Sequence, residues 1–436
     1  MISLQQDSLQ FNSKISYNFS GGDLSSDAGL VIVREFIEKT GLRTMLQERF
    51  DDDKTRTHKI SSVMEQLIYQ NIAGYHKDDD ADSLRHDPVF TRILGKKALA
   101  SQPTISRVLN DCTSEDIQAF NEILERLYLM IHTEKTKKQI ILDLDSTNVA
   151  TYGHQEDSEY IYHYSATGYH PLMLFDGLTG DLMKMVLRKG SVYTSNGVQE
   201  FLEPVIKVLR AKYPQAEILV RGDSGFAVPG LFDLCEAYGI HYLIRLKANQ
   251  VLHQLSGDVK KDFLALYQKD YTQHHAFYDD FTYQAKSWSR ERRVVCKVER
   301  EAGNLVARST YIITTLDAPS QEVVKAYNKR GTMENYIKEY KIDFGCETLS
   351  HSSFMANYAK AMILAIAYNV VGAMKQKVFP REHATRRTLS IRSLLIKFAC
   401  RVVCHARKTV IKFCSSYPEK DLFHKILRRV HRLSFG

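Results

Sequence analysis

The 436-residue sequence has few cysteines, which can crosslink a chain, and few prolines, which interrupt helices and strands: seven and nine. It has a single tryptophan. The odd number of cysteines, scattered without a CxxC pair, argues against a disulfide framework and favours reduced thiols in a cytoplasm. Cys400, Cys404 and His405 are interpreted as packing residues of one helix, because no second cluster completes a zinc tetrahedron. No internal repeat or low-complexity run is present, which argues against a solenoid.

Long hydrophobic runs are also missing. The opening segment, MISLQQDSLQF, has no basic stretch followed by an apolar run, so a secretory leader is not expected. The most apolar helix, AKAMILAIAYNVVGAM, is short and broken by Asn369 and Lys375. The sequence therefore predicts a cytoplasmic protein with no membrane partner.

Charge is abundant but uneven. The formal net charge is +8, and the segment from Lys377 to Gly436 holds fifteen Lys or Arg against three Asp or Glu. A basic end on a nearly balanced body indicates a polyanionic partner, first of all nucleic acid, with a solubilising surface as the alternative. With 44% hydrophobic residues, the chain can bury a large core in two to four domains.

Three regions follow from the residue patterns. Residues 1–135 are predicted to be mainly helical and to bind DNA. Within them, SQPTISRVLN has Pro103 at a helix start and carries Arg107, so it is a candidate recognition helix for a major groove, or simply a short surface helix. Residues 136–350 are predicted to form an α/β domain, and residues 351–436 a basic helical region.

The α/β region begins with three strand segments, QIILDLDSTNVATYG, YHPLMLFDGLTG and DLMKMVLRKGS, which indicate a meander. Helices and strands then alternate, which predicts a mixed sheet. Between about residues 248 and 310 the alternation stops, and segments such as FTYQAKSWSRERRVVCKVER indicate inserted β hairpins. It resumes with the strand STYIITTL and a charged helix.

That helix, AYNKRGTMENYIKEYKIDFG, is predicted to have one functional face and one buried face. At about 100° per residue, one stripe carries Tyr327, Arg330, Glu334 and Lys341, a carboxylate flanked by cations that suits work on phosphodiesters. The alternative is an ordinary salt-bridged helix surface. The opposite face is predicted to be buried and comprises Met333, Ile337, Tyr340 and Phe344.

Two further carboxylates stand at strand ends. Asp145 lies on the first strand and Asp223 at the end of the fourth, where adjacent strands bring side chains together at a sheet edge. With Glu334 they could hold a pair of divalent metals, and an oxygen-only ligand set favours magnesium over zinc. Asp143 shares a strand face with Asp145 and is the competing first ligand. A single Asp at such a place is more often a strand-end cap.

Several motifs resemble those of a known family. DST from Asp145, GDSGF from Gly222 and the Y-x2-R-x3-E-x6-K pattern from Tyr327 resemble the three acid-bearing motifs of bacterial insertion-sequence DDE transposases, in the branch with the Tyr-Arg-Glu-Lys signature. YGHQED, TGYHPLMLFDGLTG, SQPTISR and SIRSLLIKFACRVVCHARK are similar to the thirteen-eighty group of insertion sequences. The similarity covers nearly the whole chain.

The resemblance implies an RNase H-like catalytic domain interrupted by a β-strand insertion, with Asp145, Asp223 and Glu334 as catalytic residues and ligands of two Mg²⁺ ions, for which Mn²⁺ could substitute. It favours Asp145 over Asp143, because Asp-x-Thr follows that position. Tyr327, Arg330 and Lys341 would contact phosphates at the transposon end. Trp288 would stack on a displaced base, although a lone Trp is usually a core residue.

The predicted function is thus a transposase that binds the terminal inverted repeats of its own element and catalyses metal-dependent strand cleavage and transfer into target DNA. A homodimer holding paired ends in a synaptic complex, in the bacterial cytoplasm at the nucleoid, is expected by resemblance. A metal-dependent nuclease of the same fold that never joins strands, and a DNA-binding regulator without catalysis, are the alternatives.

Overall fold

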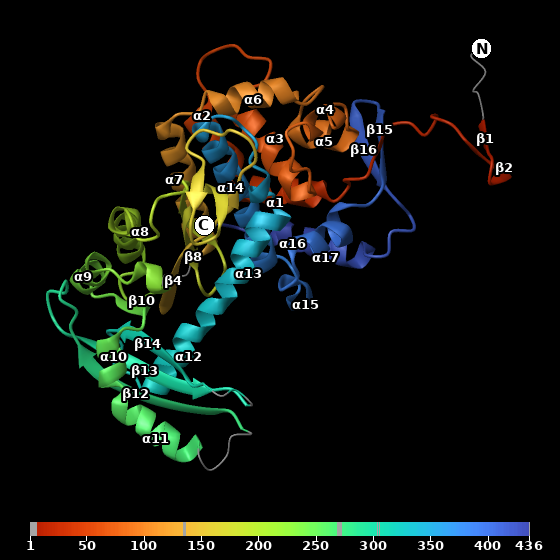
Figure 1. The fold of residues 1–436 in the computed structure, drawn as a ribbon. Coiled ribbons are helices and arrows are strands. Elements are labelled where there is room, and N and C mark those ends of the chain that lie inside the picture. The colour runs from red at the N-terminus through yellow and green to blue at the C-terminus, as the bar shows by residue number, and fades with distance from the viewer. Residues whose placement is uncertain (1–6, 134–136, 268–272, 303, 305, 436) are drawn as a thin grey trace. The chain divides into compact units, whose positions relative to one another are not determined.

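The structure is a computed structural model that describes residues 7–133, 137–267, 273–302, 304 and 306–435 (Figure 1). The chain divides into two compact units, one formed by Met1–Ile123 with Ile342–Gly436 and the other by Leu124–Lys341. We call them unit 1 and unit 2. The two terminal regions, predicted as residues 1–135 and 351–436, therefore both contribute to unit 1. The bounds differ from the prediction, because residues 124–135 belong to unit 2 and residues 342–350 to unit 1.

Unit 2 is built on an eight-stranded sheet of order β12-β13-β14-β11-β10-β4-β8-β9 (Figure 1). The strands are β4 (Gln139–Ser146), β8 (Leu172–Asp176), β9 (Leu182–Val186), β10 (Glu217–Gly222), β11 (His241–Leu246), β12 (His275–Tyr283), β13 (Arg292–Arg300) and β14 (Arg308–Thr314). The helices are α8 (Val198–Lys212), α9 (Pro229–Ala237), α10 (Gln250–Leu255), α11 (Gly257–Tyr267), α12 (Ser320–Asn328) and α13 (Thr332–Lys338).

Five neighbouring strands have the RNase H-like arrangement. β8 is antiparallel to β4 and β9 to β8, whereas β10 runs parallel to β4 and β11 parallel to β10. The first three strands are the predicted meander, and α8 and α9 belong to the crossovers that connect parallel strands. The predicted α/β fold with a mixed sheet and flanking helices is confirmed.

The segment around residues 248–310 does contain a β hairpin, but this hairpin extends the main sheet. β14 pairs antiparallel with β11, β13 with β14, and β12 with β13. Without them β11 would be an edge with unpaired backbone N–H and C=O groups, so the added strands cover an otherwise exposed edge. The segment also begins with two helices, α10 and α11, which the sequence analysis did not predict.

Alternate residues of the sheet pack on opposite faces. On β10, Ile218 and Val220 belong to the large core that includes residues of α8 and α9, whereas Leu219 packs with Val323 and Val324 of α12. Because side chains alternate along a strand, the residue two positions after Leu219 also faces α12. Residues at the strand end that lie an even number of positions after Leu219 therefore also point toward the helical segment α12–α13.

A small sheet of order β5-β7-β6 follows β4. It consists of β5 (Val149–Ala150), β6 (Glu159–Ile161) and β7 (Ala166–Tyr169), all antiparallel. An isolated bridge between Tyr169 and Lys189 ties it to the chain that leaves β9. This arrangement brings residues 159–170 and 189–197 beside the end of β4.

Unit 1 is mainly helical. Its helices are α1 (Leu30–Thr40), α2 (Leu42–Phe50), α3 (Ile60–Ala73), α4 (Asp80–Ser83), α5 (Pro88–Leu94), α6 (Gln102–Asn110), the first part of α7 (Ser114–Ile131), α14 (Phe354–Lys377), α15 (Arg381–Ala384), α16 (Thr388–Ile391) and α17 (Lys420–Arg432). Its strands are β1 (Asp7–Leu9), β2 (Asn12–Tyr17), β3 (Leu24–Ser25), β15 (Cys400–His405) and β16 (Lys408–Phe413).

The apolar helix α14 is the central helix of unit 1. Contrary to expectation, Asn369 does not break it, since the helix runs without interruption for 24 residues. Within the described part of the chain it is the one helix long and apolar enough to cross a membrane, but 89% of its most apolar window is buried in the structure. It packs on α3 and α6, so its hydrophobicity is explained by the core.

The C-terminal region is not entirely helical, which corrects the sequence prediction. Residues Cys400–His405 form β15, paired antiparallel with β16. Cys400 is buried and Cys404 exposed, as separate positions of a strand rather than a cluster on a helix. The β-branched pairs Val402–Val403 and Val410–Ile411 explain the strand preference. All seven cysteines are free, as predicted.

Candidate active site

Asp143 is fully buried on β4 and is held by Arg221 of β10. The in-register parallel pairing places the two residues side by side. Nε and Nη2 of Arg221 donate to Oδ1 and Oδ2 of Asp143, both at 2.6 Å, and Nη1 donates to the carbonyl oxygen of Ala326 in α12 at 2.8 Å. Burial raises the pKa of Asp143, and Arg221 opposes the shift. Since Arg221 occupies both carboxylate oxygens, Asp143 fits a structural anchor better than a metal ligand.

Asp145 lies at the end of β4 and is largely buried, with 16% of its side chain exposed. Nη2 of Arg330 forms an ion pair with Oδ2 at 3.0 Å, and the backbone N–H of Ser146 donates to Oδ1 at 2.9 Å. Burial raises the pKa of Asp145 to about 6; Arg330 opposes the rise, and the charges of Asp223 and Glu334 add to it. The three acids thus repel one another, and this crowding favours a cation among them.

Asp223 follows the last residue of β10, at the edge where β4 also ends. Its Oδ1 accepts a hydrogen bond from the backbone N–H of Gly225 at 2.8 Å, which caps the short 3₁₀ turn Ser224–Phe226. A Cβ at Gly225 would lie 2.8 Å from Cγ2 of Thr194, so glycine allows this turn to pack closely. Parallel neighbouring strands bring their carboxyl ends to one edge, as predicted for Asp145 and Asp223.

Glu334 comes from the helical segment that covers the same face. α12 is followed by a 3₁₀ turn, Lys329–Gly331, then by α13 and a π-helical turn, Glu339–Asp343. The predicted buried face is confirmed, because Met333, Ile337 and Tyr340 are buried. The 3₁₀ and π turns change the angle per residue, so the expected stripe is not regular. Arg330 turns inward, with 13% of its side chain exposed, whereas Glu334 is exposed.

Tyr327 and Lys341 flank this segment. Tyr327 is partly buried, and burial raises its pKa, with Arg330 opposing the rise. Lys341, at the end of unit 2, is also partly buried. The Nε atom of Arg330 is buried without a hydrogen-bond partner, so this guanidinium still has a donor for an additional acceptor.

Two aspartates at adjacent strand ends, with a glutamate from a helix over the same face, form an acidic site on an RNase H-like sheet. A model of the family described as transposase DDE domain, group 1, matches residues 7–435. The chain belongs to this family. It is also similar to the solved structure of the piggyBac transposase synaptic complex with hairpin DNA, at 14% sequence identity over 89% of this chain and 81% of that one, with a TM-score of 0.43. No curated protein matches the chain.

DDE transposases generally use divalent metal ions. In this conformation the carboxylate oxygens of Asp145, Asp223 and Glu334 do not all lie within 4.8 Å of one another. A shared ion would therefore need the three side chains to move closer together. Asp145, Asp223 and Glu334 offer only carboxylate oxygens, the ligands that Mg²⁺ prefers. Burial is the main cause of the raised pKa of Asp145, and the charges of Asp223 and Glu334 add to it. Arg330 supplies a positive charge next to Asp145 in the structure.

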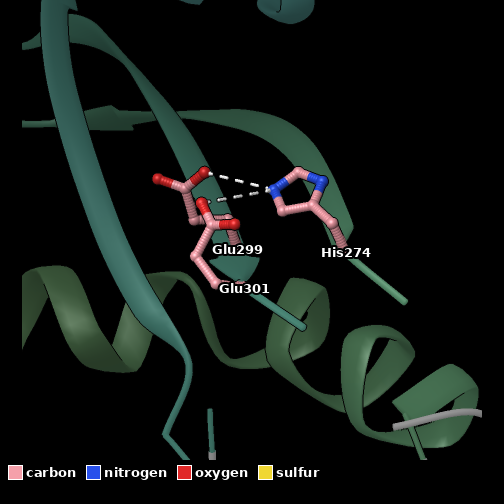
Figure 2. Close-up of side chains that lie close together, drawn as sticks. All are labelled: His274, Glu299 and Glu301. Atoms are coloured by element: carbon pink, nitrogen blue, oxygen red, sulfur yellow. Dashed lines mark ion pairs between the residues drawn. The ribbon is translucent and has the colours of Figure 1, made fainter. Parts of the chain in front are cut away.

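A different group has the tightest metal-like arrangement among the described residues. The ligand atoms of His274, Glu299 and Glu301 all lie within 4.8 Å of one another, and Figure 2 shows the three side chains facing each other. Nε2 of His274 lies 3.6 Å from Glu299 and 4.0 Å from Glu301. Lys297 also pairs with Glu299, and His274 and Glu301 are exposed. These contacts describe a surface ion-pair cluster on β13 and its neighbouring segments, separate from Asp145, Asp223 and Glu334.

Trp288 lies in the turn between β12 and β13 and is only 8% exposed. Its ring packs edge-on against Phe232 and Tyr283, with centroid distances of 5.4 and 5.1 Å, and the guanidinium of Arg292 lies 5.6 Å from it. In this conformation the indole is a core side chain. Stacking on a DNA base would require the turn to open, and this role stays a prediction.

Arg107 is an exposed residue of α6 in unit 1. The predicted short helix is present, with Pro103 in its first turn. The guanidinium of Arg107 donates within the same helix, to the carbonyl oxygen of Pro103 and to Oγ1 of Thr104, both at 3.3 Å. These contacts hold the side chain along the helix surface, and its contact with DNA stays a prediction.

The sequence analysis missed two residues that shape the site, Arg221 and Tyr164. Arg221 is a charged residue within the otherwise apolar strand EILVRG, which could have indicated a buried ion pair. The hydroxyl of Tyr164 donates to the carbonyl oxygen of Ser146 at 3.1 Å. Burial raises the pKa of Tyr164 to about 12, with smaller contributions from Asp145 and Asp223. No local signal in the sequence predicts that contact.

Proposed function

We propose that this DDE transposase belongs to the Tyr-Arg-Glu-Lys branch and the thirteen-eighty group, and that it cuts the ends of its own insertion sequence and joins them to target DNA. The observation that supports this proposal is the placement of Asp145 and Asp223 at neighbouring ends of the parallel strands β4 and β10, with Glu334 on α13, although these residues are far apart in the chain. Arg330 lies in the same site, bound to Asp145. The combination suits a reacting phosphodiester.

Asp145, Asp223 and Glu334 would hold two Mg²⁺ ions, or Mn²⁺ in their place, which supply Lewis acidity to the attacking and leaving oxygens. The oxygen of a water molecule would first attack the phosphorus atom at the element's 3′ end, and the bond from phosphorus to the 3′ oxygen would break. The released 3′-hydroxyl would then attack a phosphorus atom of target DNA in line, and the bond from that phosphorus to the 3′ oxygen of the target strand would break. Asp143 would keep β4, β10 and α12 in register during both steps through Arg221.

The cationic residues would place the DNA. Arg330 has an unpartnered Nε donor, and its planar fork matches phosphate oxygens. Tyr327 and Lys341 would contact neighbouring phosphates, and Arg107 with the basic C-terminal region would contact the duplex of the terminal inverted repeats. Because two ends are cut together, we propose a homodimer on paired ends, acting in the bacterial cytoplasm at the nucleoid.

The test is a reaction of the full chain with Mg²⁺, a duplex carrying the element's end, and a plasmid. A transposase yields both nicked ends and ends joined to plasmid. Glu334→Gln should abolish both products and leave binding of the duplex intact, whereas Glu322→Gln, which removes an exposed carboxylate paired with Lys325 on α12, should leave both products unchanged. Nicking without joining would support the nuclease, and binding unaffected by metal with no product would support the regulator.

A further inference from the structure

We propose that a tyrosine-lined cavity beside Asp223 holds an unpaired nucleobase of the DNA strand next to the cut. The inference rests on the proposed function and adds to it a specific contact with a base. The cavity measures about 320 Å³ and is lined by residues of β4, β6, the loop after β9 and the turn after β10. Asp223 and Ser146, the neighbour of Asp145, are part of its wall. A group bound there would lie next to the reacting phosphate.

The rim of the cavity is aromatic and open to solvent. Tyr160, Tyr162 and Tyr193 are 48%, 87% and 53% exposed. The rings of Tyr160 and Tyr162 lie 5.2 Å apart at 89°, edge to face, so they do not stack on each other. Exposed aromatic faces beside a nucleic-acid path are stacking platforms for unpaired bases. Three such side chains around one cavity are otherwise an unfavourable exposure of apolar surface.

The loop that carries Tyr193 is held in place by a buried arginine. Arg188 is buried, and its Nε donates to the carbonyl oxygen of His170 at 2.9 Å. Its Nη1 donates to the carbonyl oxygens of Thr194 and Asn196, both at 3.1 Å, and burial lowers its pKa to about 10. Arg188 thereby fixes the loop that carries Tyr193. A preformed cavity binds its ligand without first ordering a loop.

Other contacts hold the segment that carries Tyr160 and Tyr162 in place. Besides the bond from the Tyr164 hydroxyl to Ser146, the Ser191 hydroxyl donates to Glu159 at the start of β6. A Cβ at Gly190 would meet the carbonyl oxygen of Glu159 at 2.2 Å, so only glycine allows this close approach. The small sheet and the loop after β9 are thus locked together beneath the exposed rings.

The chemistry of the lining favours a base over a phosphate. Lys247 is the only Lys or Arg among the described residues that line the cavity, and Asp223 contributes a negative charge. A phosphate would meet one ammonium group, one carboxylate and the imidazoles of His163 and His170 there. A base can stack on a tyrosine and use the hydroxyls of Ser146 and Thr194, which lie 3.3 Å apart. Lys247 suits the phosphate adjacent to that base.

The first experiment locates the base. A duplex end carrying 5-iodouracil at successive positions around the cut is bound to the full chain in Ca²⁺ and irradiated, and the linked residue is identified by mass spectrometry. We expect crosslinks to Tyr160 or Tyr162, reduced at least tenfold in Tyr160→Leu/Tyr162→Leu. Tyr152→Leu is the matched control, because Tyr152 is 83% exposed in the same region but is not part of the cavity wall. Equal crosslinking in both variants, or crosslinks only to Trp288, would overturn the inference.

The second experiment measures cleavage in Mg²⁺. We expect the double variant to cut a fully paired end at least tenfold more slowly than wild type, in line with the strength of base stacking. Mismatching the base pair beside the cut should restore most of the rate, since the base is then already unpaired. Normal cutting of the paired end by the double variant would contradict the inference. If wild type cuts nothing but the tyrosine crosslink forms, the proposed function fails and the base site stands.

Discussion

At the scale of single residues, the proposed metal site depends on whether a cation can displace Arg330 from Asp145. Arg330 binds Asp145 at 3.0 Å, and the pKa of Asp145 is nevertheless raised to about 6 because burial and two neighbouring acids outweigh that contact. Any cation that binds the triad must meet a deprotonated Asp145 and compete with Arg330. Arg330 is then free to turn its donors to a phosphate.

The raised pKa predicts how metal binding changes with pH. A carboxyl group with a pKa of about 6 is ionised at pH 7.5 and mostly protonated at pH 5, so the affinity for Mg²⁺ or Mn²⁺ should fall by about tenfold between these values. Calorimetric titration of the full chain with Mn²⁺ at both pH values measures this. Asp145→Asn should bind weakly at both. A wild-type affinity that does not change over this range would contradict the assignment of Asp145 as a ligand.

Residue chemistry also decides which features of the site could be predicted from the sequence alone. The period of two along a strand puts Asp143 and Asp145 on one face, and it leaves both as candidates. The difference between them is a partner 78 positions away, Arg221, which engages both oxygens of Asp143. Likewise, the composition of the β12–β13 turn cannot distinguish a stacking Trp288 from a core Trp288, because Phe232 comes from α9.

At the scale of elements, local patterns predicted the strands and helices whose faces are buried uniformly. The meander of β4, β8 and β9 and the buried face of α13 were predicted correctly, since each depends on residues close in sequence. The continuation of the sheet through β14, β13 and β12 depends on long-range pairing with β11, which no local pattern encodes. Propensity is a weak guide there because tertiary pairing decides.

The hairpin β15–β16 shows why one element was predicted wrongly. Its turn consists of Ala406 and Arg407, both with positive φ, 48° and 65°. Type I′ hairpin turns usually carry Asn-Gly, and without these residues no turn is predicted at this position. The apolar residues and the Cys400 and Cys404 spacing then suggested a helix. The native turn is strained because both of its residues carry a Cβ at positive φ.

That strain predicts a stabilising change. Ala406→Asn/Arg407→Gly should increase the free energy of unfolding of the chain by about 1 kcal/mol, because Asn and Gly adopt positive φ at little cost. Urea denaturation followed by circular dichroism measures the shift. Thr409→Gly, placed in the neighbouring strand rather than the turn, serves as the control and should destabilise the chain. A double variant that is no more stable than wild type would show that the hairpin is not strained.

At the scale of the whole molecule, part of the surplus of positive charge in the C-terminal segment lies on the exposed side of α17. On α17, Leu422, Phe423, Ile426 and Val430 are buried, and the helix packs on α1 within unit 1. The opposite side exposes Lys425, Arg428 and Arg432. The composition predicted a polyanion partner, and the amphipathic helix makes these cations available to one without loss of core packing.

This arrangement predicts a salt-dependent contact with duplex DNA that is separate from the acidic site. Replacing Lys425, Arg428 and Arg432 by Ser should weaken binding and make the slope of log affinity against log salt shallower by about 2 to 3, since each cation that neutralises a phosphate contributes about 0.9. Fluorescence anisotropy with an end duplex at several NaCl concentrations gives both values. A matched variant with Ser at three exposed lysines of unit 2, Lys207, Lys212 and Lys261, should keep the wild-type slope. Equal slopes in the two variants would place the DNA away from α17, and the charge of this helix would then serve solubility alone.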